Sequence, residues 1–277
     1  MSVLDGHNAA CGYPMPMTAD EQREEASSAA WQRILVDGHK PMKAMRGAFR
    51  AMPSAPRCKV CQSPFGGLGG KMFGLAGFRP SRKNPALCAR CCEGLPPGGA
   101  VVDVAVLFAV VRASTTLGEK LSAGEFARRM NRFYSIATGV LVSHGAVIDK
   151  LIGDEVMALF LRGMAGPSYR EKAVAAGEAL LRAAAREDPS VRLPLGVAVH
   201  AGPAFVGNVG SAAVVDFTAL GDTVNTAARL QGEAQAGVLV VSEGIWESAG
   251  RPAGMEARTL SLRGREESVR VRVKTVA

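Results

Sequence analysis

The sequence predicts an α+β protein of the ferredoxin-like type, preceded by a small cysteine-rich module and a short helix. Between residues 101 and 200 the pattern is strand, helix, hairpin, helix, strand, which is the ferredoxin-like order. Of the 277 residues, 48% are hydrophobic, which is ample for a packed core. The net charge of +8 is concentrated near the N-terminus, because eleven Lys and Arg and no Asp or Glu lie between Gly38 and Cys92. These observations separate a basic N-terminal part from a larger C-terminal domain.

The residues before the cysteines show no motif that carries chemistry. Residues 1–28 are mixed in composition and rich in Ala, Ser and Glu, so we expect a disordered tail. Residues 29–57 are expected to form a basic helical segment. In it Met45 and Phe49 share one face, and Arg46 lies in the neighbouring basic sector. Packing of the apolar stripe against the following module is favoured over contact with an anionic membrane surface or a nucleic acid.

Residues 58–97 form a cysteine-rich module with its linker. Two Cys-x-x-Cys pairs, separated by 26 residues, supply the expected ligands Cys58, Cys61, Cys88 and Cys91. The N-terminus has no apolar stretch of signal length, and no run approaches the roughly 18 apolar residues of a membrane span, so we expect a cytoplasmic location in which thiols stay reduced. Four such thiols suit a structural zinc site. An iron–sulfur cluster and unligated or redox-active thiols remain as alternatives.

Residues 98–277 are predicted to be one domain that begins after a Pro- and Gly-rich boundary. A buried strand spans 101–111, and the hairpin spans 147–160 with a turn at Gly153 and Asp154. Capping boxes begin the two helices, with Ser122 and Glu125 at the first and Ser168 and Glu171 at the second. The further elements expected are a strand at 195–200, a helix near 225, a strand at 238–241 and an alternating strand at 269–274.

Three ordered motifs lie in this domain, at 106–116, 150–160 and 216–229. The second reads Lys-x-x-Gly-Asp-x-x-Met-Ala-x-Phe from Lys150 to Phe160, and the third reads Asp-Phe-Thr-Ala-Leu-Gly-Asp-Thr-Val-Asn-Thr-Ala-Ala-Arg. In order and spacing, residues 101–275 resemble the catalytic domain of class III adenylate and guanylate cyclases, with a Lys/Thr pair similar to the bacterial adenylate-type branch. The resemblance implies an enzyme that converts ATP to cyclic AMP and pyrophosphate.

The resemblance also implies a two-ion site for Mg²⁺ or Mn²⁺, held by two Asp residues. Asp154 matches the second carboxylate of the family. At the first position this sequence has Val110, whose isopropyl group cannot bind a cation. Ala113 stands where the family prefers Gly, so a Cβ could obstruct the approach of backbone N–H groups to phosphate.

The other functional positions of the family are intact. Lys150 and Thr218 match the base-recognising pair, and Arg263 matches a triphosphate contact. Asn225 and Arg229, four residues apart on a helix, match the residues that orient the ribose and stabilise phosphate charge. The family divides these groups between two chains, so the resemblance implies a homodimer, or a heterodimer in which another cyclase chain supplies both Asp residues.

Two functions therefore remain open from the sequence. The first is an adenylate cyclase that is weak or depends on a partner chain, and the intact base and ribose positions favour it. The second is a catalytically inactive pseudo-cyclase that binds a nucleotide or a partner as a regulatory module, and Val110 favours it.

Overall fold

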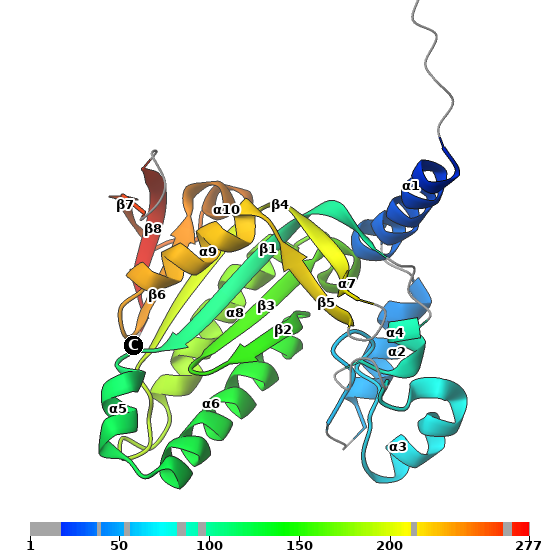
Figure 1. The fold of residues 1–277 in the computed structure, drawn as a ribbon. Coiled ribbons are helices and arrows are strands. Elements are labelled where there is room, and N and C mark those ends of the chain that lie inside the picture. The colour runs from blue at the N-terminus through cyan, green and yellow to red at the C-terminus, as the bar shows by residue number, and fades with distance from the viewer. Residues whose placement is uncertain are drawn as a thin grey trace, which may run out of the picture.

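A mixed eight-stranded sheet organises the chain (Figure 1). The computed structural model describes residues 18–37, 40–52, 56–81, 87–93, 98–211, 215–262 and 268–276. The sheet order is β2-β3-β1-β4-β6-β8-β7, and β5 pairs with β4 off this path. The strands are β1 (Gly99–Val111), β2 (Val147–Ile152), β3 (Glu155–Leu161), β4 (Leu195–Gly210), β5 (Val215–Leu220), β6 (Val238–Ser242), β7 (Glu256–Leu260) and β8 (Val269–Thr275).

The first four strands confirm the ferredoxin-like prediction. They lie in the order β2-β3-β1-β4 with antiparallel neighbours, and Val104 of β1 is opposite Leu161 of β3 and Gly202 of β4. Strand β4 is much longer than the predicted 195–200, because its second half stays paired with β1 as far as Gly207 and also pairs with β5 from Phe205 to Gly210. Strand β6 pairs with β4 in parallel and extends the sheet on the other side.

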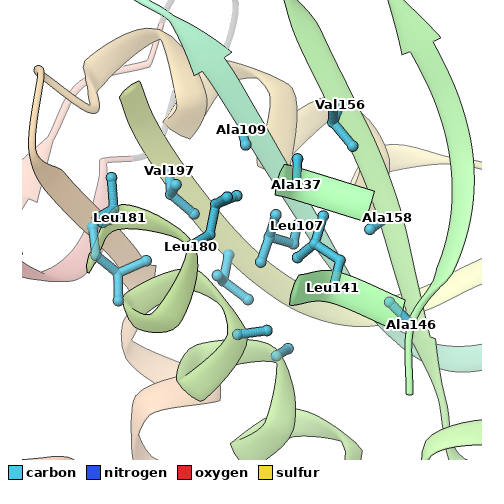
Figure 2. Close-up of a cluster of buried hydrophobic side chains, with 14 of the residues drawn as sticks. Leu107, Ala109, Ala137, Leu141, Ala146, Val156, Ala158, Leu180, Leu181 and Val197 are labelled. Atoms are coloured by element: carbon cyan, nitrogen blue, oxygen red, sulfur yellow. The ribbon is translucent and has the colours of Figure 1, made fainter. Parts of the chain in front are cut away.

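Helices α6 (Ala123–Ser143), α8 (Tyr169–Ala185) and α10 (Glu243–Ser248) cover one face of the sheet. Alternate residues of β1 point into this layer. Figure 2 shows Leu107 of β1 among Leu141 of α6 and Leu180 of α8, and all three are fully buried. Among the described residues, the buried side chains of this layer are apolar except for Tyr169, whose hydroxyl donates to Asp103.

The N-terminal part packs on the opposite face, as does helix α9 (Asp222–Glu233). The N-terminal part comprises α1 (Ala19–Gln32), the π-helical turn η1 (Arg33–Asp37) and α2 (Lys40–Arg50). Trp31 of α1 is fully buried and stacks on Phe217 of β5 with ring centroids 5.9 Å apart. Trp31, Leu35 and Phe49 join one core with the other alternate residues of β1, Val104, Val106 and Phe108. The cysteine module and the sheet therefore share a core across residue 98.

The helix α1 corrects the prediction of a disordered tail up to residue 28. A capping box of Thr18 and Glu21 begins this helix, because the Thr18 hydroxyl accepts from the Glu21 N–H and the Glu21 carboxylate accepts from the Thr18 N–H. Its exposed side is polar, and the few apolar residues that anchor it lie near its end, so no helical stripe was visible. Residues 1–17 lie outside the described residues.

The helix α2 forms as predicted, but Arg46 does not lie on an exposed basic face. Arg46 is 5% exposed and donates to the carbonyls of Val60 in the cysteine module and of Ala146 before β2, the latter at 3.2 Å. Burial lowers the pKa of its guanidinium to about 10, so it remains charged at neutral pH. This buried cation joins α2, the module and the sheet.

One of the two predicted capping boxes is confirmed. At α6 the Ser122 hydroxyl accepts from the Glu125 N–H and the Glu125 carboxylate accepts from Ser122. At α8 Ser168 occupies the N-cap position without a capping hydrogen bond from its side chain, so that capping box is not formed. The remaining helical elements are α3 (Gly67–Phe73), η2 (Gly74–Phe78), α4 (Ala89–Glu93), α5 (Ser114–Lys120) and α7 (Arg162–Ala165). Within the described residues, each helix is too short or too polar to span a membrane.

Candidate functional site

The four predicted cysteine ligands lie together in the N-terminal module. Their sulfur atoms are all within 4.8 Å of one another, and all four residues are buried. A tight turn holds the first pair, since the Gln62 N–H donates to the Cys58 carbonyl at 3.0 Å. In the second pair the Cys91 N–H points at the Cys88 sulfur at 3.3 Å. Four sulfurs at this spacing suit a tetrahedral metal ion with no open position.

The four thiols cannot all ionise without a cation between them. Hydrogen bonds from the neighbouring thiols lower the pKa of Cys58, whereas hydrogen bonds to the same neighbours raise the pKa of Cys91. A metal ion would remove this competition because each sulfur could then be a thiolate. Among the residues that the structure describes, this is the one group of three or more His, Cys, Asp or Glu side chains placed to share a metal ion.

The predicted hairpin is confirmed, with Asp154 at its tip. Gly153 adopts φ +58°, a conformation that glycine adopts readily and that turns β2 into β3. The Tyr134 hydroxyl on α6 donates to the Gly153 carbonyl at 2.5 Å and anchors the turn. The Asp154 carboxylate accepts from the Ser114 hydroxyl at 2.5 Å, and its carbonyl accepts from the Val111 N–H at 2.9 Å. The carboxylate is thus fixed beside the end of β1.

The end of β1 supplies no carboxylate of its own beside Asp154. Val110 is opposite Glu155 and 7% exposed, on the sheet face away from α6. The Ser114 hydroxyl donates to the Asp154 carboxylate, and Glu155 follows Asp154 in the chain. The half-buried Glu155 carboxylate accepts from the Gln231 side-chain amide at 3.1 Å, and burial and the neighbouring Asp154 raise its pKa. Asp154 with Ser114 suits a hard cation that arrives with phosphate ligands of its own.

The turn after β1 holds Ala113 in a strained backbone conformation. Ala113 has φ +56° and ψ +30°, the left-handed region that favours glycine, and it occupies the N-cap of α5. Next to it, the Arg112 guanidinium donates to the carbonyls of Ala234, at 2.5 Å, and Gln231 at the C-terminal end of α9. A cation at this end is stabilised by the helix dipole, so Arg112 holds α9 against the turn.

The predicted pair Lys150 and Thr218 is brought together from β2 and β5. The Lys150 ammonium donates to the Thr218 hydroxyl oxygen at 3.0 Å, and the Thr218 hydroxyl donates to Asp149 Oδ2 at 2.8 Å. Asp149 is fully buried, and burial raises the pKa of its carboxyl group. Its second oxygen has no hydrogen-bond partner among the described residues. Asp149 therefore fixes the direction of the Thr218 hydroxyl proton.

A lysine from the cysteine module reaches the same place. Lys59, between the first two cysteines, donates to the Asp149 backbone carbonyl and forms an ion pair with Asp216 at 3.3 Å. The Asp216 carboxylate also faces Lys150, at 3.8 Å. One carboxylate therefore lies between two ammonium groups, one from the module and one from the sheet.

The predicted ribose and phosphate residues lie elsewhere. Asn225 is exposed and Arg229 half-buried on α9, one turn apart. In the described part of the chain, neither side chain has a hydrogen bond or ion pair to Lys150, Thr218 or Asp154. Arg263 lies outside the described residues.

Residues 99–271 match the family described as the adenylate and guanylate cyclase catalytic domain. The chain belongs to this family. The cyclase domain also has the fold of solved cyclases. The structure of the guanylyl cyclase Cya2 matches with a TM-score of 0.59 and 23% identity over 64% of this chain and 93% of that chain. The adenylyl cyclase CyaB from P. aeruginosa matches with a TM-score of 0.54 and 25% identity over 62% and 92%.

Curated relatives extend the similarity into the N-terminal part. The chain is 31% identical over 260 residues to the uncharacterized protein Rv1319c of Mycobacterium tuberculosis, which covers 92% of this chain and 46% of the relative. It is 25% identical over 207 residues to an adenylate cyclase of Anabaena cylindrica, over 70% of this chain and 41% of that protein. The chain thus spans about half the length of the curated relatives it matches.

Sequence reasoning missed Asp149, Asp216, Lys59 and Ser114. Asp149 directly precedes Lys150 and Asp216 lies two residues before Thr218, so their places in the cyclase motifs were a usable signal. Lys59 gave no signal, because its contact with Asp216 joins residues 157 positions apart in different parts of the chain.

Proposed function

We propose that this chain is a purine nucleotide cyclase of low intrinsic activity that converts ATP to cyclic AMP and pyrophosphate, alone or with a partner chain. In that reaction the ribose 3′ oxygen bonds to the α-phosphorus, the bond from that phosphorus to the pyrophosphate oxygen breaks so that pyrophosphate leaves, and the 3′ hydroxyl proton is released to water. The observation that carries the proposal is the contact between Lys150 and Thr218 at 3.0 Å, with the Thr218 proton committed to Asp149.

This arrangement supports ATP over GTP. A hydroxyl has one proton and two lone pairs, and the Thr218 proton is used by Asp149 while one lone pair is used by Lys150. Towards a base, Thr218 can then only accept. The adenine amino group can donate to it, whereas guanine would present the acceptor oxygen O6. Lys150, a donor, suits an acceptor nitrogen of the adenine ring.

The metal requirement belongs to the same proposal. Cyclases of this family use Mg²⁺ or Mn²⁺, and Asp154 with the triphosphate would hold one such ion in this chain. The ion would neutralise charge on the phosphates. Asn225 and Arg229 would contact the ribose and the phosphates, as the resemblance implies, and Arg263 would contact the triphosphate. A homodimer would bring these groups to the Asp154 of the other chain.

In the cysteine module we propose Zn²⁺ bound by Cys58, Cys61, Cys88 and Cys91. The support is the closed set of four buried sulfurs within 4.8 Å. An iron–sulfur cluster is the alternative. Metal analysis of protein purified without oxygen separates the two, because a cluster would bring inorganic sulfide and visible absorption.

The second candidate function is an inactive nucleotide-binding or partner-binding module. Val110 favours it, because the position lacks the carboxylate that a second ion would need. In this reading Lys150 and Thr218 still bind the base, but no cyclic nucleotide is released.

The experiment compares cyclase activity of the full chain with that of Val110→Asp, with Ala113→Gly as a second change. We expect weak activity that prefers Mn²⁺, and a gain of at least about tenfold from Val110→Asp, or about 1.4 kcal/mol of barrier. Mixing with an inactive cyclase chain that keeps both Asp residues tests the heterodimer. If neither the variants nor the mixture cyclise ATP or GTP, the inactive-module reading holds.

A further inference from the structure

The strand that carries Lys150 contains an irregularity at the residue before it. The register of β2 against β3 shifts between Ile148 and Lys150, so Asp149 is the extra residue of a β-bulge. A bulged residue leaves part of its backbone outside the ladder, and a buried carbonyl without a partner is costly. Here the Asp149 carbonyl accepts from the Lys59 ammonium. The cysteine module therefore completes the hydrogen bonding of β2 beside Lys150, which with Thr218 forms the base-recognition pair.

Lys59 also affects which group Lys150 contacts, because the Asp216 carboxylate that pairs with Lys59 lies close to Lys150 as well. Asp216 lies 3.3 Å from Lys59 and 3.8 Å from Lys150, while Lys150 lies 3.0 Å from Thr218. The side chain of Lys59 is only 17% exposed, so water screens this pair less than it would screen a surface pair. Without Lys59, the Asp216 carboxylate would lose this ion pair and would draw Lys150 away from Thr218 more strongly.

The place of Lys59 is set by the cysteines on each side of it. Two backbone hydrogen bonds hold the turn that carries Lys59. The Gln62 N–H donates to the Cys58 carbonyl, and the Cys58 N–H donates to the Ser63 carbonyl, each at 3.0 Å. A metal ion on Cys58 and Cys61 would fix both ends of the turn and thereby the direction of the Lys59 side chain.

We propose that Lys59 is a positioning residue of the base-recognition pair, and that metal binding by the four cysteines sets the nucleotide affinity through it. The inference rests on the proposed function, since it concerns the same nucleotide site. It makes the cysteine module a sensor of metal loading or thiol oxidation, because loss of either the metal or the thiolates would release the Lys59 turn.

The test uses the full chain loaded with one equivalent of Zn²⁺ and the variants Lys59→Ala, Asp216→Ala and the double variant. Lys71→Ala is the matched control, because Lys71 is exposed on α3 of the same module. Zinc content is measured for each variant. We expect Lys59→Ala to keep its zinc and to bind ATP about tenfold more weakly, as for the loss of a charged hydrogen bond. The double variant should recover to within about threefold of the starting protein, since Asp216 no longer competes for Lys150.

Zinc removal supplies the second half of the test. In the starting protein, chelation should weaken ATP binding about as much as Lys59→Ala does. In Lys59→Ala, chelation should weaken ATP binding little further, because the Lys59 side chain that connects the module with the pair is already absent. Equal effects of chelation in both backgrounds would overturn the proposed route through Lys59. So would a Lys59→Ala variant that binds ATP as tightly as the Lys71→Ala control.

Amide hydrogen exchange distinguishes failure of this inference from failure of the proposed function. In the absence of nucleotide, Lys59→Ala should speed exchange in residues 147–152 and 215–220, and Lys71→Ala should not. If the starting protein binds neither ATP nor GTP, the proposed function fails, and the exchange comparison still decides whether Lys59 orders the two strands. Unchanged exchange in both strands would sink the inference.

Discussion

At the scale of single residues, Asp149 decides what the base-recognition pair can accept. Leu is similar in size to Asp but cannot accept the Thr218 proton. We therefore expect Asp149→Leu to reduce the preference for ATP over GTP about fivefold, which corresponds to one hydrogen bond of about 1 kcal/mol. Asp149→Asn is the control, because its amide oxygen can still accept from Thr218. The measurement is the ratio of the two dissociation constants. An unchanged ratio in Asp149→Leu would show that Thr218 orients itself without Asp149.

Motifs in the sequence selected candidate site residues, and the structure shows where some of them lie. Lys150, Thr218 and Asp154 were placed by motif, and the structure brings the first two together and fixes the third at a turn. The contacts around them were not predictable, because Asp149 accepts from Thr218 across 69 positions and Lys59 reaches Asp216 across 157. Such pairs depend on how the ribbon of β4 and β5 folds back and on how the module docks.

At the scale of elements, the two predicted capping boxes offer a matched comparison. Ser122→Ala should lower the free energy of unfolding by about 1 kcal/mol, because the Glu125 N–H loses its acceptor. Ser168→Ala should change it by less than about 0.5 kcal/mol, because that hydroxyl makes no capping hydrogen bond. Urea unfolding of the two variants checks both values. A similar loss in each would mean that α8 is capped in solution after all.

Local patterns also explain which elements were found. The hairpin was predictable because Gly153 and Asp154 separate two apolar runs. The outer half of β4 was missed because Gly202 and Pro203 read as a strand end, although the backbone continues to Gly210. Helix α1 was missed because it is polar on most sides and is held by Trp31, whose partner Phe217 lies far along the chain. Tertiary packing overrode the local signal in both places.

At the scale of the whole molecule, metal removal should destabilise the sheet as well as the module. Cys58, Cys61 and Cys88 belong to the same buried cluster as Val104 and Val106 of β1. We expect a single thermal transition. The reference is protein with free zinc at about one hundred times the dissociation constant of the site. Relative to that reference, chelation should lower the free energy of unfolding by about 3 kcal/mol. Circular dichroism of the full chain with and without chelator gives the measurement. Two transitions, with only the smaller one moved by chelation, would contradict a shared core.

The close packing of η1 against α7 restricts how the sequence of this protein can evolve. Gly163 has no room for a side chain, since an added Cβ would lie 2.3 Å from the carbonyl oxygen of Ile34. The N-terminal part and the cyclase domain therefore constrain each other's sequence residue by residue. A recombination event that moved residues 18–93 onto another cyclase would also have to carry a glycine at this position and an aromatic partner for Trp31. We therefore expect the two parts to evolve together and not to be exchanged separately between cyclases.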